Sequence, residues 1–315
     1  MKFKLYLYLA AVAAVSLSVS CKSKGSAPTD TPTSGTTTIS VDESFRPIID
    51  AEIAVFESLY PQAGILAIYS DEVNALNLLL RDSVRAAIAT RPLTTEERES
   101  FESRKLFPKE VKIATDGIAI IVNCTNKDSL FSLQTLREIL TGKVTRWKEL
   151  NPKSTLGKIQ VMFDNPQSST VRFLIDSLCK EETLSEDLRS QLLNIDVVSY
   201  VAEHPNALGI IGVSWVSNRL DTTCMGFLPH VCVAGISREA VATPGNSYQP
   251  YQAYIATGDY PLRRDVYILL TDPRVGLASG FTSFLSSDRG QRIILKSGIM
   301  PATQPVRVVQ LRENL

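Results

Sequence analysis

The sequence contains few residues that could act as catalytic bases or metal ligands. Only two of its 315 residues are histidines, His204 and His230, and they lie far apart beside prolines. It has no Gly-x-Ser-x-Gly motif and no cluster of His, Asp and Glu with metal-ligand spacing. Serine or metal hydrolysis needs such groups within hydrogen-bond reach. The sequence therefore argues against an enzyme and predicts no metal ion and no cofactor.

Neither sign of charge is in excess. The 33 Lys and Arg residues balance 33 Asp and Glu residues, so no global basic field is available to recruit nucleic acid. After residue 20 no apolar run is long enough to cross a bilayer. The length of the chain leaves room for one large domain or for two lobes.

The chain starts with the features of a bacterial export signal. Two lysines precede an apolar run from Leu5 to Val19, which predicts a signal peptide over residues 1–20. Cys21 follows small residues and resembles the lipidated cysteine of a lipobox, although Ser18 stands where leucine is usual. An ordinary signal peptide with an incidental cysteine is the alternative. We expect a periplasmic protein that Cys21 anchors to the bacterial envelope, at either the inner or the outer membrane.

The stretch after Cys21 has the composition of a flexible tether. Residues 21–35 are rich in Ser, Thr, Gly and Pro and lack large apolar side chains. Four further cysteines follow, at positions 124, 179, 224 and 232. In an oxidising compartment Cys224 and Cys232 can close a short loop or stay reduced. Cys124 and Cys179 are expected to be buried free thiols.

Predicted strands alternate with predicted helices, which indicates an α/β fold. Strands are expected at 36–41, 65–69, 86–90, 159–163 and 208–213, and as two runs within 111–122 that break at Asp116-Gly117. Helices are expected at 46–60, 72–80, 133–140 and 281–295, with others starting near Thr94 and after Thr170.

Polar groups follow three of the predicted strands, at the points where helices begin. They are Ser44 with Phe45, Thr90 with Arg91, and Ser168 with Ser169 and Thr170. In open α/β sheets ligands bind beyond the carboxyl ends of the strands, where helix N-termini offer unpaired N–H groups. Hydroxyls, amides and one guanidinium suit a small oxyanion. Each serine can equally be a helix cap, and Arg91 can instead pair with Glu96 or Glu97.

Several segments resemble the PstS-like phosphate-binding proteins of ABC importers. They are Ala87–Thr94, Asp116–Asn123, Leu136–Lys143 with Trp147, Phe284–Leu285, Gly290–Gln291 and Gly298–Ala302. The resemblance implies an α/β, two-lobe, type II-like periplasmic-binding-protein fold with two hinge crossings. Lobe 1 would comprise residues 36–115 plus 218–315, and lobe 2 residues 116–217, with crossings near Asp116 and Val213. It also implies a non-enzymatic protein that captures phosphate between its lobes and delivers it to an ABC permease.

The segment that would bind the anion departs from the family pattern. That family has a Ser-Gly-Thr run preceded by arginine; Ser168, Ser169 and Thr170 stand in the run, but Asp164 stands in the arginine place. Ser44, Phe45 and Thr90, from the two earlier junctions, are expected to complete the site, and Arg91 or Arg172 is the candidate to replace the missing cation. Because monohydrogen phosphate carries a proton, a carboxylate such as that of Asp42, Asp71 or Asp164 can select it over sulfate. Two alternatives stay open: another ligand, or a sensing or interaction lipoprotein with this fold.

Overall fold

The computed structural model describes residues 30–180, 182–217 and 228–304. The predicted signal peptide, Cys21 and Cys224 lie outside the described residues. Within these ranges no helix is long and apolar enough to span a membrane. The last residues of the predicted tether contact the folded protein, because Asp30 Oδ1 accepts a hydrogen bond of 2.7 Å from the amide of Leu277.

One ten-stranded sheet runs through the molecule in the order β2-β1-β3-β11-β4-β8-β6-β7, with β9 and β12 also paired to β4. Its strands are β1 (Gly35–Asp42), β2 (Ala63–Ser70), β3 (Ala86–Ala89), β4 (Lys109–Asn123), β6 (Gln160–Phe163), β7 (Arg189–Ser190), β8 (Ala207–Gly212), β9 (Val231–Val233), β11 (Arg263–Leu270) and β12 (Met300–Pro301). A separate pair is formed by β5 (Leu130–Ser132) and β10 (Gly235–Ser237).

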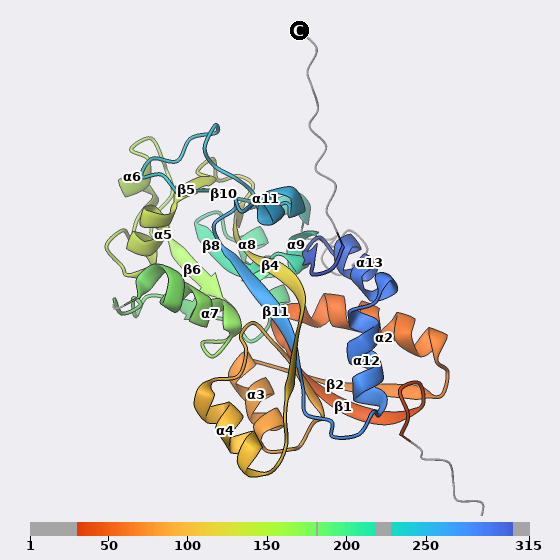
Figure 1. Cartoon of the computed structure of the whole chain (residues 1–315). Coiled ribbons are helices and arrows are strands. Elements are labelled where there is room, and N and C mark those ends of the chain that lie inside the picture. The colour runs from red at the N-terminus through yellow and green to blue at the C-terminus, as the bar shows by residue number, and fades with distance from the viewer. Residues whose placement is uncertain (1–29, 181, 218–227, 305–315) are drawn as a thin grey trace, which may run out of the picture.

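Helices cover both faces of the sheet (Figure 1). They are η1 (Glu43–Phe45), α2 (Arg46–Leu59), α3 (Glu72–Leu80), α4 (Thr95–Ser103), α5 (Leu133–Leu140), α6 (Trp147–Leu150), α7 (Ser169–Leu174), the π-helical turn η2 (Ile175–Cys179), α8 (Asn194–Glu203), α9 (Ser214–Ser217), η3 (Leu228–His230), α11 (Gln252–Thr257), α12 (Leu277–Leu285) and α13 (Asp288–Lys296). Side chains cap several of them: Asp71 accepts from Asn74 N, and Thr94 forms a capping box with Glu97.

Strand β4 joins the two lobes. Its residues 109–117 pair with β11, whereas residues 118–122 pair with β8. In Figure 1, β4 and β11 lie side by side between β1–β3 with α2–α4 and α12, here called the first lobe, and β6–β8 with α5–α8, here called the second lobe. The predicted α/β two-lobe fold is confirmed. The predicted break at Asp116-Gly117 is wrong, because β4 runs through this dipeptide without interruption.

The polypeptide approaches itself closely at the point where β4 changes partners. The amide of Val213 donates a hydrogen bond of 2.9 Å to the Gly117 carbonyl, so two residues near the predicted crossings touch. A Cβ atom on Gly117 would lie 3.2 Å from Ile255 Cδ1 and 3.3 Å from Pro250 Cβ. Glycine therefore allows α11 to pack against the crossing strand.

The C-terminal helix predicted over 281–295 is in fact two helices, α12 and α13. The chain turns at Ser286 and Ser287, and the Ser287 hydroxyl accepts a hydrogen bond from the amide of Gly290 to start α13. Apolar periodicity continues across this turn, since Phe281, Leu285 and Ile294 are all buried in one core. Periodicity alone therefore concealed the break, although serine followed by aspartate is a helix-start signal.

The cysteines pair differently from the prediction. Cys232, at the centre of β9, forms a disulfide with Cys124, which follows the end of β4. The expectation that Cys124 is a free thiol is therefore wrong, whereas Cys179 is free and buried as predicted. The bonded residues are 108 positions apart in sequence, but the pairing of β9 with β4 brings them together.

Loss of this disulfide should strongly destabilise the protein. Because the bond closes a long loop, Cys232→Ser is expected to lower the free energy of unfolding by roughly 4–5 kcal/mol in the chain-entropy account. Chemical denaturation with and without dithiothreitol measures this, and the reductant should not affect the double variant Cys124→Ser/Cys232→Ser. A Cys124→Ser protein as stable as the wild type would show that Cys232 bonds elsewhere.

Glu52 is a carboxylic acid in the apolar core. It lies on α2 with 0% exposure, on the same helix as buried Ile49 and Phe56, and neither of its carboxyl oxygens has a hydrogen-bond partner among the described residues. Burial raises the pKa of Glu52 from 4.5 to about 9. The folded protein therefore holds Glu52 neutral at a pH where the unfolded chain ionises it.

The wild-type protein should consequently lose stability as pH rises from 4.5 towards 9, because the native state alone retains the Glu52 proton. Glu52→Gln removes this pH-dependent loss of stability, which amounts to roughly 3 kcal/mol at pH 7. Urea unfolding of both proteins between pH 4.5 and 8 checks the prediction, with exposed Glu99→Gln as the control. Parallel pH profiles for Glu52→Gln and wild type would contradict it.

Candidate functional site

A buried guanidinium lies where the two lobes meet. Arg264, on β11, is 5% exposed, and its Nε and Nη2 atoms both lie 3.1 Å from Asp116 Oδ2 on β4. Its Nη1 donates to Ser169 Oγ at 2.8 Å and to Thr170 Oγ1 at 3.4 Å, both on α7 of the second lobe. Its guanidinium carbon is 5.3 Å from the centre of the Phe45 ring. Arg264 thus gathers three residues that the sequence analysis proposed for the site.

Carboxylates surround this guanidinium. Asp42, at the end of β1, is fully buried, and its Oδ1 accepts from the Ser44 amide at 3.0 Å. Asp164 Oδ1 accepts from Ser168 Oγ at 2.6 Å, and Asp164 Oδ2 accepts from Asn194 Nδ2 at 3.1 Å. We call Asp42, Asp116, Asp164 and Arg264, with the hydroxyls of residues 44 and 168–170, the buried cluster.

Burial makes these carboxyl groups weaker acids than exposed aspartates, because it raises their pKa values. It raises the pKa of Asp42, that of Asp116 to about 6 and that of Asp164 to about 7, and the Arg264 charge opposes each shift only in part. Burial also raises the pKa of the neighbouring Glu43 to about 7, although Asn194 donates to its carboxylate. The buried cluster can therefore exchange protons near neutral pH.

Several polar atoms of the buried cluster are unsatisfied. Ser44 Oγ, Asp42 Oδ2 and Asp116 Oδ1 are buried without a hydrogen-bond partner among the described residues. Arg264 Nη2 also makes no hydrogen bond there, although it forms the ion pair with Asp116. Ser44 is not a helix cap, since Asp42 fills that role, and its carbonyl is fixed by Ser214 Oγ and Trp215 Nε1. Buried polar groups are ordinarily paired. The buried cluster thus retains both donors and acceptors for a polar ligand.

A second set of contacts bridges the lobes beside the buried cluster. Glu72 of α3 accepts from the amide of Thr90 at 2.6 Å and from its hydroxyl at 2.8 Å. Arg172 of α7, in the second lobe, donates from Nε to Glu72 Oε2 at 2.6 Å and from Nη2 to Thr90 Oγ1 at 2.7 Å. Burial alone would raise the pKa of Glu72, but the bonds from Arg172 and Thr90 outweigh it and lower the pKa. An ionised Glu72 therefore holds the lobes together.

Arg91 does not join the buried cluster. Its two terminal nitrogens bind both carboxylate oxygens of Glu97, at 2.7 and 2.8 Å. This is the pairing that the sequence analysis left open as an alternative. Glu97 Oε2 also accepts from the Thr94 amide, so the helix cap and the ion pair support each other.

A cleft of about 560 Å³ opens between the lobes next to the buried cluster. Its described lining residues are Thr90, Arg91, Pro92, Lys112, Thr115, Arg172, Phe173, Ala256, Arg263, Arg264, Asp265, Tyr267 and Met300. Five of these residues are cationic and one is acidic. Arg91 and Arg172, which the sequence analysis named as replacement cations, thus meet Arg264 at this cleft.

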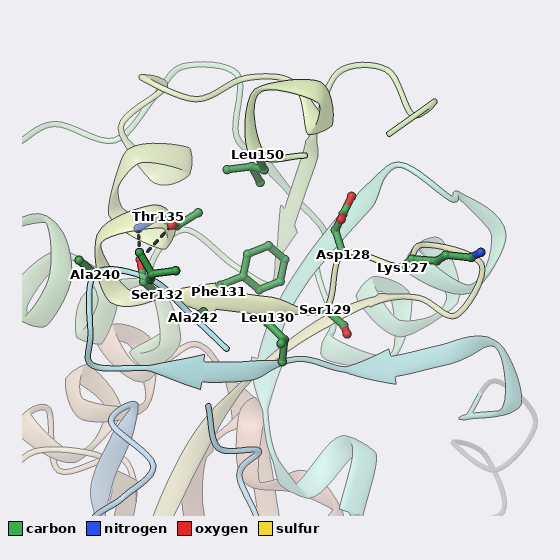
Figure 2. Close-up of a pocket in the computed structure, with 11 residues that line it drawn as sticks. Lys127, Asp128, Ser129, Leu130, Phe131, Ser132, Thr135, Leu150, Ala240 and Ala242 are labelled. Atoms are coloured by element: carbon green, nitrogen blue, oxygen red, sulfur yellow. Dashed lines mark hydrogen bonds between the residues drawn. The ribbon is translucent and has the colours of Figure 1, made fainter. Parts of the chain in front are cut away.

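Another hollow, of about 340 Å³, lies on the second lobe beside β5 and β10. Figure 2 shows Ser132 and Thr135 hydrogen-bonded to each other at the start of α5, with Phe131 beside them. The Ser132 hydroxyl accepts from the Thr135 amide and so caps α5. Lys127 and Asp128 balance each other in charge, and this hollow lacks the concentrated cations of the inter-lobe cleft.

Arg264 is the important residue that the sequence analysis missed. Alternation along β11 would have indicated it, because Arg264, Val266 and Ile268 share the buried face of the strand. An arginine on the buried face of a strand needs a partner and marks a polar site. Asp116 and Asn194 were missed for a related reason: their partners are distant in sequence.

Two lobes that share a sheet and meet at a polar cleft define a solute-binding architecture. Residues 26–289 match the family model described as PBP superfamily domain, and the chain belongs to that family. The family consists of solute-binding proteins rather than enzymes.

Several proteins similar to this chain carry phosphate-related names. The phosphate-binding protein PstS of Bacillus subtilis (strain 168) is 25% identical over 275 residues, which cover 86% of this chain and 82% of that protein. PstS of Staphylococcus aureus (strain USA300) is 26% identical over 210 residues, covering 65% of this chain and 60% of that protein. The crystal structure of an ABC-type phosphate transport receptor from Vibrio cholerae superposes with a TM-score of 0.61 at 22% identity, covering 84% and 99% of the two chains.

Removing the charge of Glu72 should loosen the closed arrangement. Glu72→Gln leaves Arg172 without its buried counter-charge, so we expect the lobes to separate and the radius of gyration in small-angle X-ray scattering to increase. Asp176→Asn is the matched control, since Asp176 also binds Arg172, at 3.2 Å, but from the same lobe. A Glu72→Gln protein as compact as wild type would refute the bridging role.

Proposed function

We propose that this chain is an extracytoplasmic lipoprotein that captures phosphate between its lobes and delivers it to an ABC importer. The observation that carries the proposal is the meeting of Arg264 with the hydroxyls of Ser169 and Thr170 at the lobe junction. Relatives named phosphate-binding proteins support it. Guanidinium and hydroxyl donors are the groups that proteins use for phosphate.

The acids of the buried cluster favour phosphate over a fully ionised anion. With a pKa near 7, Asp164 can accept a hydrogen bond from a protonated phosphate oxygen or donate one when protonated. Sulfate at neutral pH carries no proton to offer. It would also face Asp42, Asp116 and Asp164 with Arg264 as the one cation in the buried cluster. Discrimination then comes from unfavourable contacts with sulfate as much as from favourable ones with phosphate.

The anchor and the permease complete the proposed function. Lipidation of Cys21 would tie residues 21–35 to the envelope membrane, and the folded protein would present its cleft outside the cytoplasm. The disulfide between Cys124 and Cys232 supports an oxidising compartment. Release to the permease requires the lobes to part, which breaks the contacts of Arg172 with Glu72 and of Arg264 with Ser169.

The proposed lobe limits, 36–115 plus 218–315 and 116–217, remain a prediction. The crossing near Asp116 agrees with the change of partners along β4. The pairing of β9 with the last residues of β4, and of β10 with β5, favours a later second crossing, near Leu262. Ile118 supports this placement, because its amide donates to the Leu262 carbonyl at 2.8 Å.

Phosphate should stabilise the protein against heat. At a hundred times its dissociation constant a ligand of the native state adds about 2.7 kcal/mol of stability. Differential scanning calorimetry of the full mature chain with phosphate, sulfate, molybdate and tungstate tests this, and phosphate should raise Tm most. No stabilisation by any of these anions would favour the alternative of a sensing or interaction lipoprotein.

A charge variant tests whether phosphate binds beside Ser169. Ser169→Asp places a carboxylate against Arg264, which should abolish stabilisation by phosphate. Ser177→Asp is the matched control, because it adds the same charge to an exposed position of the continuing helix. If phosphate stabilised both variants equally, the anion site would lie away from Ser169.

A further inference from the structure

The inter-lobe cleft has features that a site for inorganic phosphate alone does not need. Its volume of about 560 Å³ falls in the range of roughly 300–1,000 Å³ that is typical of pockets for drug-sized ligands. Its wall also includes partly buried aromatic side chains, Phe173 from the second lobe and Tyr267 from the first. A small hydrated oxyanion makes no use of such a wall.

The cations of the cleft differ in how fully their donors are used. Arg91 is bound by Glu97, and Arg172 by Glu72 and Asp176, so these guanidiniums are largely neutralised. Arg263 has no carboxylate partner among the described residues; its one hydrogen bond there runs from Nη1 to the Ile255 carbonyl at 3.2 Å. Its Nε and Nη2 groups remain for an anion.

Lys112 is a further cation of the cleft. Its one ion pair in the described part of the chain is with Asp265, at 2.6 Å. Asp265 also accepts from Thr115 Oγ1 at 2.9 Å, and it is the one acid among the described residues that line the cleft. An anion near Lys112 therefore competes with a single carboxylate.

Arg263, Lys112 and one aromatic side chain lie on a common surface. Residues 263, 265 and 267 alternate along β11 and share one face of the strand. Lys112 and Thr115 lie on the neighbouring β4, opposite Tyr267 and Asp265 respectively. Phe173 of α7 faces the same cleft from the second lobe. A ligand here would contact charged and aromatic groups and both lobes at once.

We propose that this cleft binds an organic phosphate monoester, with its phosphoryl group at Arg264, where the proposed function places phosphate, and its organic group between Phe173 and Tyr267. Arg263 and Lys112 add positive charge to the wall of the cleft. The proposal rests on the proposed function, since it assigns the phosphate to a larger molecule. Arg264 connects the two regions: it lines the cleft and binds the hydroxyls of the buried cluster. Closure around a monoester then buries an apolar group that orthophosphate lacks.

Calorimetric titration of the full mature chain with phenyl phosphate, orthophosphate and pyrophosphate tests the inference. Burying an aromatic ring should lower the dissociation constant of phenyl phosphate about tenfold relative to orthophosphate. Tyr267→Ala and the milder Phe173→Leu should reduce that gain and leave orthophosphate affinity within twofold. Asp265→Asn, which removes the lining carboxylate, should tighten phenyl phosphate binding, whereas Arg263→Gln should weaken it about tenfold. Leu130→Ala, in the hollow of Figure 2, is the control and should change nothing.

Each contrary outcome has a distinct meaning. Equal affinity for phenyl phosphate and orthophosphate would overturn the inference and leave the proposed function standing. Pyrophosphate binding as tightly as phenyl phosphate would also overturn it, because the cleft would then recognise charge alone. Failure of all three compounds to bind the folded wild-type protein would reject both the inference and the proposed function.

Discussion

The burial of Arg264 is the constraint on which the rest of this structure depends. A guanidinium that loses its water must find negative or polar partners, and the loss of solvation is costly unless the geometry is good. Arg264 finds Asp116 on the crossing strand and two hydroxyls on α7. Because Asp116 lies on the strand between the lobes and the two hydroxyls lie on the second lobe, Arg264 holds the second lobe against the crossing strands β4 and β11.

The acids around Arg264 determine which anion the site can accept. Burial raises the pKa values of the three aspartates, and the charge of one guanidinium offsets these shifts only in part. A protonated phosphate suits such a site because it brings negative charge for the guanidinium and a hydrogen atom for a carboxylate. The aspartate in the family's arginine place is then compatible with phosphate, since Arg264 approaches the same hydroxyls from β11.

Local patterns in the sequence predicted most of the first lobe and the hydroxyl groups of the site. Strand β1 and helices α2, α3 and α5 appear as expected, because each has apolar periodicity and a recognisable start. The sequence indicated Ser169 and Thr170 as candidates because they begin the helix that follows a buried strand. Arg264 and the partner of Cys232 were not found, since each depends on a contact made more than ninety residues away. The turn between α12 and α13 escaped because the apolar pattern continues across it.

The most direct test of the central claim is equilibrium dialysis of the mature chain against labelled orthophosphate, with wild-type protein and Arg264→Gln compared at pH 7. The account predicts one phosphate per wild-type chain and a large loss of binding in the variant, with the fold preserved by circular dichroism. Retention of wild-type affinity by a folded Arg264→Gln protein would contradict it.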